Sequence, residues 1–373
     1  MIRRSPGFVA GIAVACAALA FAVAGCGSSN SSSTSSGSSS GSSTTSSKAG
    51  KVAVLLPDTK SSVRWETQDR KYLDQAFTAA GVDHTIVNAQ GDPATQASQA
   101  DQAITNGAKV ILLVDLDPGS GAAIIKKAHN QGVKVIDYDR LTLGGGADYY
   151  VSFNNETVGK LQGQGLVKCL QGKSNPVVAE LNGSPTDNNA TLFANGYNSV
   201  LDPKYSAGAF KKGPNQSVPD WDNQKALTIF EQMLQQTNNK IDGVLAANDG
   251  LANSVISALN ARKLGKIPVT GQDATAQGIQ HILAGEQCMT VYKAVKGEAD
   301  AASKLAIGLA KGQTPTTNAS TDNKGTKTPS VLLTPVAVTK ANIKDTVIKD
   351  GFLKPSDICV GKYASLCQSA GIS

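Results

Sequence analysis

The sequence lacks the short motifs that mark common enzyme classes and nucleic-acid-binding proteins. It contains no Gly-x-Ser-x-Gly elbow, no Walker loop and no His-Glu-x-x-His pair, and no nucleophile stands beside an oriented base. The three histidines, His84, His129 and His281, are scattered, and we expect none of them in a functional site. Lys and Arg form no basic run, and the net charge is only +6. We therefore expect neither an enzyme nor a nucleic-acid-binding protein, and no cofactor.

The first fifty residues indicate export. Two arginines precede an apolar stretch at residues 8–24, which is short for a membrane span and ends in small residues, as in a secretory signal peptide at residues 1–26. Cys26 closes the sequence Val-Ala-Gly-Cys and resembles the lipidated cysteine of bacterial lipoproteins, although it can also be a leftover residue of an ordinary signal peptide. Residues 27–50 are rich in Ser and Gly, which predicts a flexible tether with a reach of roughly 25–30 Å.

Cysteine is scarce, with six residues in the chain. None has a metal-ligand spacing with another Cys or with His, so we expect no metal site. In an exported protein the even number that remains after the signal peptide favours disulfides. Cys359 and Cys367 lie close together in a short tail and are the favoured pair, whereas Cys169 with Cys288 follows only by subtraction and stays open.

The body of the chain alternates short Val/Ile/Leu runs with amphipathic helical patterns. From Lys51 onward it is long enough for two domains of about 150 residues, and the alternation restarts after residue 153. This pattern predicts parallel sheets covered by helices on both faces. Strands are predicted at 51–57, 85–87, 110–114, 133–136, 177–181, 243–247, 267–270 and 288–292, and helices at 72–80, 94–105, 120–130, 158–170, 190–200, 224–236, 251–261, 274–284 and 298–311.

Polar residues follow the ends of these predicted strands. In open α/β sheets, ligands bind beyond the carboxyl ends of the strands, so two such edges that face each other would form a cleft that can close. The residues are Asp58, Asp115, Asp139 with Arg140, Asn182, Asn248 with Asp249, and Gln272 with Asp273.

The chemistry of the candidate residues suits an uncharged sugar. Each hydroxyl of a sugar both donates and accepts, and planar Arg, Asp and Asn groups can engage neighbouring hydroxyls in pairs. Tryptophan rings cover the C–H faces of a pyranose. The donors are Arg64, Arg140 and Lys293, the acceptors and amides are Asp187, Asp273, Asn189 and Asn248, and the flat faces are Trp65 and Trp221.

These residues lie in seven ordered segments that resemble the D-xylose-binding proteins of ABC sugar importers, which belong to the periplasmic sugar-binding family. The similarity runs from about Lys51 to Lys354. The segments are Val63-Arg-Trp-Glu66, Ile136-Asp-Tyr-Asp-Arg140, Gly183-Ser-Pro-Thr-Asp-Asn-Asn-Ala190, Ala247-Asn-Asp249, Thr270-Gly-Gln-Asp-Ala274, Met289-Thr-Val-Tyr-Lys293 and Leu333-Thr-Pro335.

The resemblance implies an α/β fold of two Rossmann-like lobes with parallel sheets, joined by a three-segment hinge, which is the type I periplasmic binding protein fold. The hinge crossings would lie near Phe153, Tyr292 and Leu333. An N-terminal lobe would comprise 51–153 plus 293–330 and a C-terminal lobe 154–292 plus 331–358, while the tail at 359–373 lies outside the family pattern. The implied sugar contacts are Arg64, Trp65, Arg140, Asp187, Asn189, Trp221, Asn248, Asp273 and Lys293.

The function that follows is capture and delivery. We expect a monomeric, lipid-anchored binding protein outside the cytoplasmic membrane or in the periplasm, which closes around a monosaccharide, D-xylose being favoured, and presents it to an ABC permease. The alternative is a multi-sugar protein for glucose, galactose or arabinose that acts as a sensory co-receptor. A sugar-responsive transcription regulator of this fold would carry a DNA-binding helix pair where this chain has a signal peptide.

Each site residue also has an ordinary explanation. Asp187 can be a helix N-cap, and Asn248 and Asp273 can be turn residues. The two arginines can be surface charges, Trp65 can cap a core, and Lys293 can be a solvated hinge residue. Trp221, in a polar Pro-Asp-Trp-Asp loop, is the hardest to explain as core.

Overall fold

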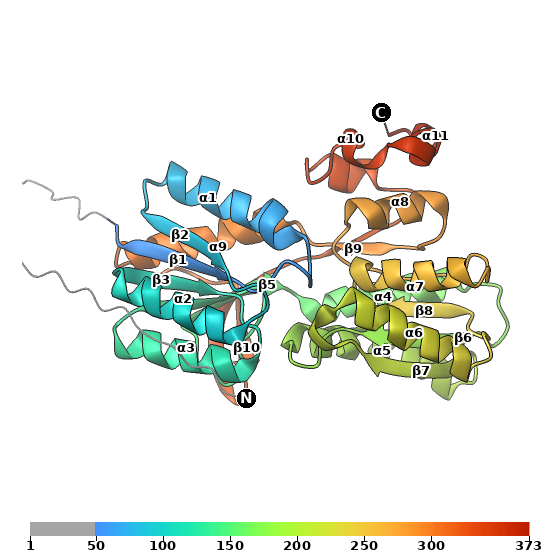
Figure 1. Ribbon diagram of the computed structural model, residues 1–373, viewed down its shortest axis with the longest axis horizontal. Coiled ribbons are helices and arrows are strands. Elements are labelled where there is room, and N and C mark those ends of the chain that lie inside the picture. Colours follow the sequence, from blue (N-terminus) through green and yellow to red (C-terminus); the bar gives the residue numbers. More distant parts are fainter. Residues whose placement is uncertain (1–48, 373) are drawn as a thin grey trace, which may run out of the picture. The chain divides into compact units, whose positions relative to one another are not determined.

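The computed structural model describes residues 49–372, which fall in one compact unit. The predicted signal peptide, Cys26 and nearly all of the predicted tether lie outside the described residues. Within the described part, no helix is both long and apolar enough to cross a membrane. The chain folds into two α/β lobes, each with its own sheet (Figure 1).

The N-terminal lobe is built on a seven-stranded sheet in the order β10-β11-β5-β4-β3-β1-β2, parallel except for the edge strand β10. Its strands are β1 (Lys51–Leu56), β2 (His84–Asn88), β3 (Ala108–Leu113), β4 (Lys134–Tyr138), β5 (Tyr149–Phe153), β10 (Ala319–Asn323) and β11 (Thr326–Leu333). Its helices are a π-helical turn (Trp65–Asp69), α1 (Arg70–Ala79), α2 (Pro93–Thr105), α3 (Pro118–Asn130) and α9 (Val295–Ala310).

Helices cover both faces of this sheet, which explains why its central strands read as unbroken apolar runs. Successive side chains of β1 point to opposite faces. Val52, Val54 and Leu56 pack in one core with α1 and α9, whereas Ala53 and Leu55 pack in another with α2 and α3. The uninterrupted hydrophobicity of β1 therefore serves two cores at once.

The C-terminal lobe has a smaller parallel sheet, β7-β6-β8, and a separate antiparallel pair, β9 with β12. Its strands are β6 (Val177–Asn182), β7 (Lys211–Ser217), β8 (Gly243–Ala246), β9 (Thr290–Tyr292) and β12 (Val336–Val338). Its helices are α4 (Asn155–Cys169), α5 (Asn188–Ser206), a 3-10 turn (Pro219–Trp221), α6 (Asn223–Gln236), α7 (Asp249–Ala261) and α8 (Ala276–Ala284).

Glycines let α4 and α5 approach closely. A Cβ atom on Gly159 would lie 2.0 Å from the carbonyl oxygen of Phe193, and one on Gly196 would lie 2.2 Å from that of Glu156. Any larger residue at either position would push the two helices apart. The close contact fixes the position of the first turns of α5, which carry residues of the site described below.

The chain crosses between the lobes after β5, after β9 and after β11. These points match the crossings expected near Phe153, Tyr292 and Leu333. Strand β11, however, stays paired with β5 up to Leu333, so the N-terminal lobe extends three residues beyond the expected boundary at residue 330.

Strands β7 and β10 are among those missing from the predicted ranges. β7 and β10 are sheet-edge strands with mostly polar sequences, Lys-Lys-Gly-Pro-Asn-Gln-Ser and Ala-Ser-Thr-Asp-Asn, and neither shows the apolar runs of a buried strand. Edge strands such as β7 and β10 need no apolar pattern on both faces, which is why they leave little trace in the sequence. The strand expected at 267–270, in contrast, was predicted but is reduced to one bridge, between Val244 and Val269.

The segment after β12 folds onto the C-terminal lobe. It contains a π-helical turn (Lys344–Ile348), α10 (Pro355–Ile358), a 3-10 turn (Gly361–Tyr363) and α11 (Ala364–Ser369). Ile358 and Cys367 share a core with Ile279 and Ile282 of α8. Disulfides join Cys359 to Cys367 within this tail and Cys169, at the end of α4, to Cys288, before β9.

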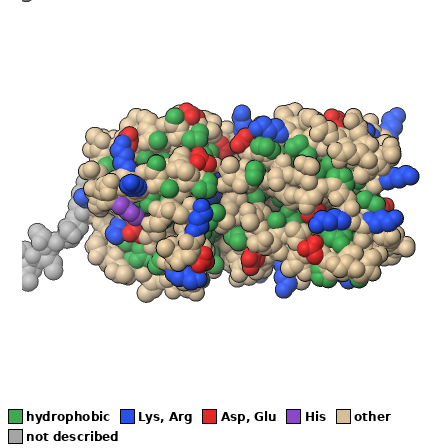
Figure 2. Space-filling model, turned by 90° about the horizontal axis from the view of Figure 1, so that it is seen from below, with side chains coloured by type: hydrophobic (Ala, Val, Ile, Leu, Met, Phe, Trp, Pro, Cys, Tyr) green, Lys and Arg blue, Asp and Glu red, His purple; other side chains and the backbone are tan. Residues whose placement is uncertain are grey.

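Charge is spread over the surface. On the face shown in Figure 2, Lys and Arg side chains are interspersed with Asp and Glu. Together with the modest net charge of +6, this gives no single-sign field of the kind that steers nucleic acid.

Candidate functional site

A small cavity is lined by side chains from both lobes. The structure brings all nine expected contact residues to it: Arg64, Trp65, Arg140, Asp187, Asn189, Trp221, Asn248, Asp273 and Lys293. Ser61, Ser62, Asp139, Phe193 and Gln272 complete the lining.

Arg64 lies in a buried cluster of carboxylates in the N-terminal lobe. Its guanidinium donates two hydrogen bonds to Asp69, at 2.7 and 2.8 Å, and one to Asp139 at 2.8 Å, and it also pairs with Glu298. The Tyr138 hydroxyl donates to Asp69 at 2.5 Å. With so many partners the side chain is held in one orientation, and it is not the surface charge that the sequence left open.

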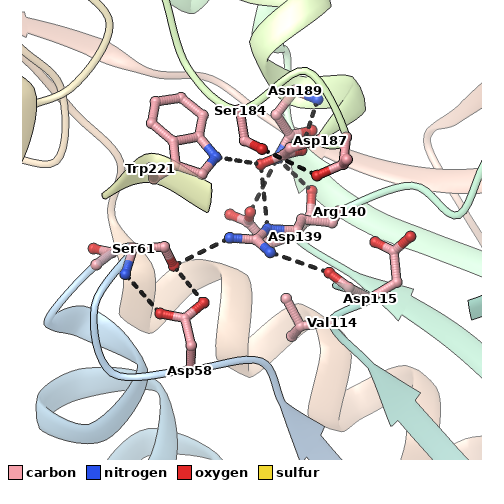
Figure 3. A network of polar contacts seen from close by, with 12 residues as sticks. Asp58, Ser61, Val114, Asp115, Asp139, Arg140, Ser184, Asp187, Asn189 and Trp221 are labelled. Carbon is pink, nitrogen blue, oxygen red and sulfur yellow. Dashed lines mark hydrogen bonds and ion pairs between the residues drawn. The ribbon is translucent and has the colours of Figure 1, made fainter. Parts of the chain in front are cut away.

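Arg140 is held by the loop that follows β1 (Figure 3). Its Nη2 donates to Ser61 Oγ at 3.1 Å and its Nη1 to the Asp115 carbonyl oxygen at 3.1 Å. Ser61 Oγ in turn donates to Asp58 at 2.8 Å and accepts from Trp65 Nε1 at 3.1 Å. One serine thus couples an arginine and a tryptophan of the cavity wall.

Asp187 and Asn248 both cap helices and line the cavity. Asp187 accepts the backbone N–H of Asn189 at 2.9 Å, at the start of α5, and the Trp221 indole N–H at 3.1 Å. Asn248 accepts the N–H of Leu251 at 2.9 Å, at the start of α7. Capping uses only part of each side chain, so the capping and ligand explanations do not exclude each other.

Direct contacts join the lobes across the cavity. Asn189 Nδ2, from the C-terminal lobe, donates to the carbonyl and carboxylate oxygens of Asp139 at 3.0 Å each. Arg140 Nε lies 3.2 Å from Asp187 Oδ2. Lys293, which follows β9, lies 3.4 Å from Asp139 and 3.6 Å from Asp273, one from each lobe. Residues of both lobes therefore form one polar network.

Three lining residues have left-handed backbone. The φ angles are 61° at Asp139, 55° at Trp221 and 96° at Asp273. Such conformations cost on the order of 1–3 kcal/mol each in residues other than Gly, and they cluster at functional sites. At Asp139 the backbone carbonyl accepts hydrogen bonds from Tyr150, Ser152 and Asn189, which stabilise the strained turn.

The charges of the lining balance. Arg64, Arg140 and Lys293 stand against Asp139, Asp187 and Asp273, three cations and three acids. Burial alone would raise the pKa of Asp139, but Lys293 and the two arginines outweigh it and lower that pKa to about 2. A cavity whose fixed charges already neutralise one another favours an uncharged polar ligand over an ion.

Hydrogen-bonding capacity remains at the cavity. Within the described residues, Gln272 Oε1 is buried without a hydrogen-bond partner, whereas Arg140 Nε and Asp273 Oδ1 have only ion-pair contacts, with Asp187 at 3.2 Å and with Lys293 at 3.6 Å. An unsatisfied buried polar atom costs about 1–3 kcal/mol, so a ligand that supplies hydroxyl groups here would gain free energy. The apolar walls come from Trp65, Trp221 and Phe193.

Five lining residues were not predicted as contacts. Asp139 and Gln272 stood among the polar residues at strand ends and could have been chosen on that ground. Phe193 lies one helical turn beyond Asn189 in α5, a spacing that puts both side chains on one face. Ser61 and Ser62 lie in a loop and carried no signal.

No arrangement suited to a metal ion is present in the described part of the chain, where no group of three or more His, Cys, Asp or Glu side chains could hold one. The three histidines do not line the cavity. His281, for example, pairs with Glu286 at 2.7 Å on α8 and the segment after it.

Comparison with known proteins places the chain among binding proteins. A family profile described as "Periplasmic binding protein domain" matches residues 52–314. The chain is 39% identical to the D-xylose-binding periplasmic protein of Escherichia coli strain K12 over 313 residues, which cover 84% of this chain and 93% of that protein. It is 34% identical to the multiple sugar-binding periplasmic receptor ChvE of Rhizobium radiobacter, over 83% of this chain and 92% of the receptor.

A solved structure supports the same family assignment. The carbohydrate transporter solute binding protein from Chloroflexus aurantiacus, in complex with D-glucose, superposes with a TM-score of 0.76 at 31% identity, over 82% of this chain and 97% of that one. The two-lobe α/β fold class and the family resemblance predicted from the sequence are confirmed.

Proposed function

This chain belongs to the periplasmic binding protein family, and from that premise we propose that it binds D-xylose or a closely related aldose for import by an ABC transporter. The relatives named above bind D-xylose, several sugars and D-glucose, respectively. The observation that carries the proposal is the cavity itself, which is small, charge-balanced and walled by two tryptophans, with hydrogen-bonding capacity left at Arg140, Gln272 and Asp273.

Binding would favour a closed arrangement of the lobes, because the ligand would contact residues of both. A ligand shifts such an equilibrium only by its difference in affinity for the two states. Arg64, Trp65 and Arg140 come from the N-terminal lobe, and Asp187, Trp221 and Asp273 from the C-terminal lobe. The closed form would then be the one that an ABC permease accepts.

We also propose that the mature protein is anchored by a lipid on Cys26 at the outer face of the cytoplasmic membrane and acts as a monomer. The relatives are periplasmic proteins, which agrees with export. The cavity lining offers no serine or other nucleophile paired with a histidine, and its carboxylates already accept hydrogen bonds, which supports binding without catalysis.

A multi-sugar receptor is the second candidate, favoured by the 34% identity to the multiple sugar-binding receptor. The two candidates differ in selectivity, so calorimetry with xylose, glucose, galactose and arabinose separates them. We expect one-to-one binding, tightest for xylose. Similar affinities for all four sugars would favour the second candidate, and flat titrations with every aldose would reject both.

The site is tested with Asp273→Ala in protein lacking its first 47 residues. Removing a buried carboxylate that contacts the ligand costs about 1–3 kcal/mol, or roughly 5- to 150-fold in affinity. Lys293 also loses its ion pair with Asp273, which adds to this loss. Asp202→Ala, on the same lobe but half exposed and paired only with Lys212, is the matched control and should bind as the unchanged protein does. Equal affinities of the two variants would remove Asp273 from the site.

A further inference from the structure

The carboxylate of Asp249 is the most heavily hydrogen-bonded acid of the C-terminal lobe that does not line the cavity. It is fully buried at the first residue of α7. Its Oδ2 accepts the backbone N–H and hydroxyl of Thr275, at 2.8 and 3.0 Å, and its Oδ1 accepts from Gln287 Nε2 and Thr290 Oγ1, at 2.8 Å each. One side chain therefore ties together the start of α7, the loop before α8, and the segment leading into β9.

Two glycines leave room for this carboxylate. A Cβ atom on Gly271 would lie 2.1 Å from Asp249 Oδ1, and one on Gly278 would lie 2.3 Å from Oδ2. Burial raises the pKa of Asp249 to about 7, although the hydrogen bonds from Gln287, Thr275 and Thr290 favour the ionised form. Ionising a buried acid costs free energy, and only glycine at Gly271 and Gly278 leaves space for this carboxylate. Packing alone therefore does not explain an aspartate at this position.

The segment that Asp249 holds contains strained backbone at the site. Asp273 and Ala274 have φ angles of 96° and 51°, two successive left-handed residues without glycine. The backbone N–H of Asp249 donates to the Gln272 carbonyl at 2.9 Å, and Ala274 N donates to Thr290 Oγ1 at 3.2 Å. Thr290 Oγ1 is also a donor to Asp249, so Asp249 contacts both ends of the turn, in addition to the backbone hydrogen bond from Asp273 N–H to the Val291 carbonyl at 2.8 Å.

We propose that Asp249 is a positioning residue for the ligand site, which holds the 272–274 turn in its strained form so that Asp273 projects into the cavity. This rests on the proposed function, in which Asp273 contacts the sugar. Asp249 acts through the turn and not by touching the ligand, because it is absent from the cavity lining within the described residues.

The proposed role requires that both carboxylate oxygens of Asp249 accept hydrogen bonds. All four groups that face Asp249 donate to it. In Asp249→Asn an NH2 group would replace one oxygen and would face donors, so at least one of these hydrogen bonds is lost while the volume is unchanged. The strained turn then loses its support and relaxes.

The test is a double-mutant cycle with Asp249→Asn and Asp273→Ala in protein lacking its first 47 residues, with D-xylose as ligand. We expect Asp249→Asn alone to weaken binding roughly 10- to 100-fold. In the Asp273→Ala background the same change should weaken it no more than about threefold, because its effect passes through Asp273. Weak binding is followed by the fluorescence of Trp65 and Trp221, which line the cavity.

An equal loss in both backgrounds would overturn the proposal, since a role in general folding stability would not depend on Asp273. Asp222→Asn is the matched control: Asp222 caps α6 in the same lobe through Gln224 and Lys225 and does not line the cavity, so affinity should be unchanged. If Asp249→Asn does not fold, Thr290→Val removes one donor to Asp249 and the acceptor of Ala274 N, and should weaken binding about 3- to 10-fold. Unchanged affinity in that variant would also overturn the proposal.

A crystal structure of Asp249→Asn separates this proposal from the proposed function. We expect Asp273 to leave the left-handed region in the variant, whether or not any sugar binds. A turn that keeps its φ near 96° would refute the positioning role even if xylose binding is established, whereas a relaxed turn in a protein that binds no aldose would refute only the proposed function.

Discussion

The two lobes hold their halves of the cavity by different means. In the N-terminal lobe, Arg64 is fixed by ion pairs with Asp69, Asp139 and Glu298, all buried. In the C-terminal lobe, cavity-lining residues lie at helix N-caps and on a strained turn, and both disulfides of the described residues lie in that lobe and its tail. No cysteine occurs in residues 51–153 or 293–333 of the N-terminal lobe.

Each half of the cavity should therefore be sensitive to a different kind of substitution. A buried ion cluster depends on every member, because removal of one charge leaves the others without a partner in a medium of low polarity. Helix caps and covalent links depend less on charge, and the buried Asp249 is the exception among the supports of the C-terminal half described above. We therefore expect the N-terminal half to respond to charge removal and pH, and the C-terminal half to respond to cysteine removal.

The largest effect is expected for Arg64→Met, which removes the cation that contacts the buried acids Asp69, Asp139 and Glu298. We expect the free energy of unfolding in urea to fall by about 3–5 kcal/mol. The control is Arg70→Met, whose pair with Glu66 is about one-third exposed and contributes about 0–1 kcal/mol. A loss at Arg64 no larger than at Arg70 would show that the cluster does not hold the N-terminal lobe together.

The next effect is expected for the double variant Cys169→Ala with Cys288→Ala. These cysteines are 119 residues apart, and a disulfide that closes a long loop stabilises by restricting the unfolded chain, typically by about 2–4 kcal/mol. The pair Cys359 and Cys367 closes a separation of only 8 residues, so its double alanine variant should lose less. Calorimetric unfolding of the two variants measures this, and the reverse order would contradict the loop-length explanation.

The third effect concerns pH. Burial raises the pKa of Glu298 to about 8, against the pairing with Arg64, which lowers it. Between pH 4.5 and 8 the folded protein thus keeps a proton that the unfolded chain has lost, so the contribution of Glu298 to the free energy of unfolding falls as pH rises, by at most about 1.4 kcal/mol per pH unit. Glu298→Gln cannot titrate, so its stability relative to the unchanged protein should improve from pH 5 to pH 8.

For Glu66→Gln we expect the opposite dependence of stability on pH. The pKa of Glu66 is lowered, first by its hydrogen bond with Arg70, so its contribution is present above pH 4.5 and is lost as pH falls further. Urea unfolding of both variants at pH 3.5, 5, 6.5 and 8 tests the pair. A Glu298→Gln difference that stays constant from pH 5 to pH 8 would refute the buried, proton-holding state of this residue.

Much of the fold could be predicted because its strands are buried on both faces. The strands β1 and β3 are continuous apolar runs, and the helices between them are amphipathic, so alternation alone indicated a parallel α/β sheet. β7 and β10 escaped because they lie at sheet edges and are polar. The lobe boundary near residue 330 was three residues short because pairing with β5, which the sequence does not display, extends β11 to Leu333.

The site could be predicted in its residue types but not in its connections. Trp221 and Asp273 were expected as contacts, and both line the cavity. Their left-handed backbone, by contrast, was not foreseeable, since it depends on support from distant segments. The hydrogen bond from Trp221 to Asp187 and that from Arg140 to Ser61 likewise join residues far apart in the chain.

The buried strands, the helices between them, the two-lobe division and many of the residues that end the strands follow from the sequence, because periodicity and strand-end chemistry are local properties of the chain. The folded structure was needed to show that Arg64 is buried among three acids, that Asp139 contacts both lobes and that Asp249 accepts hydrogen bonds from the loop next to Asp273. Burial and pairing of charges depend on which segments meet in space, and that meeting is a property of the whole fold.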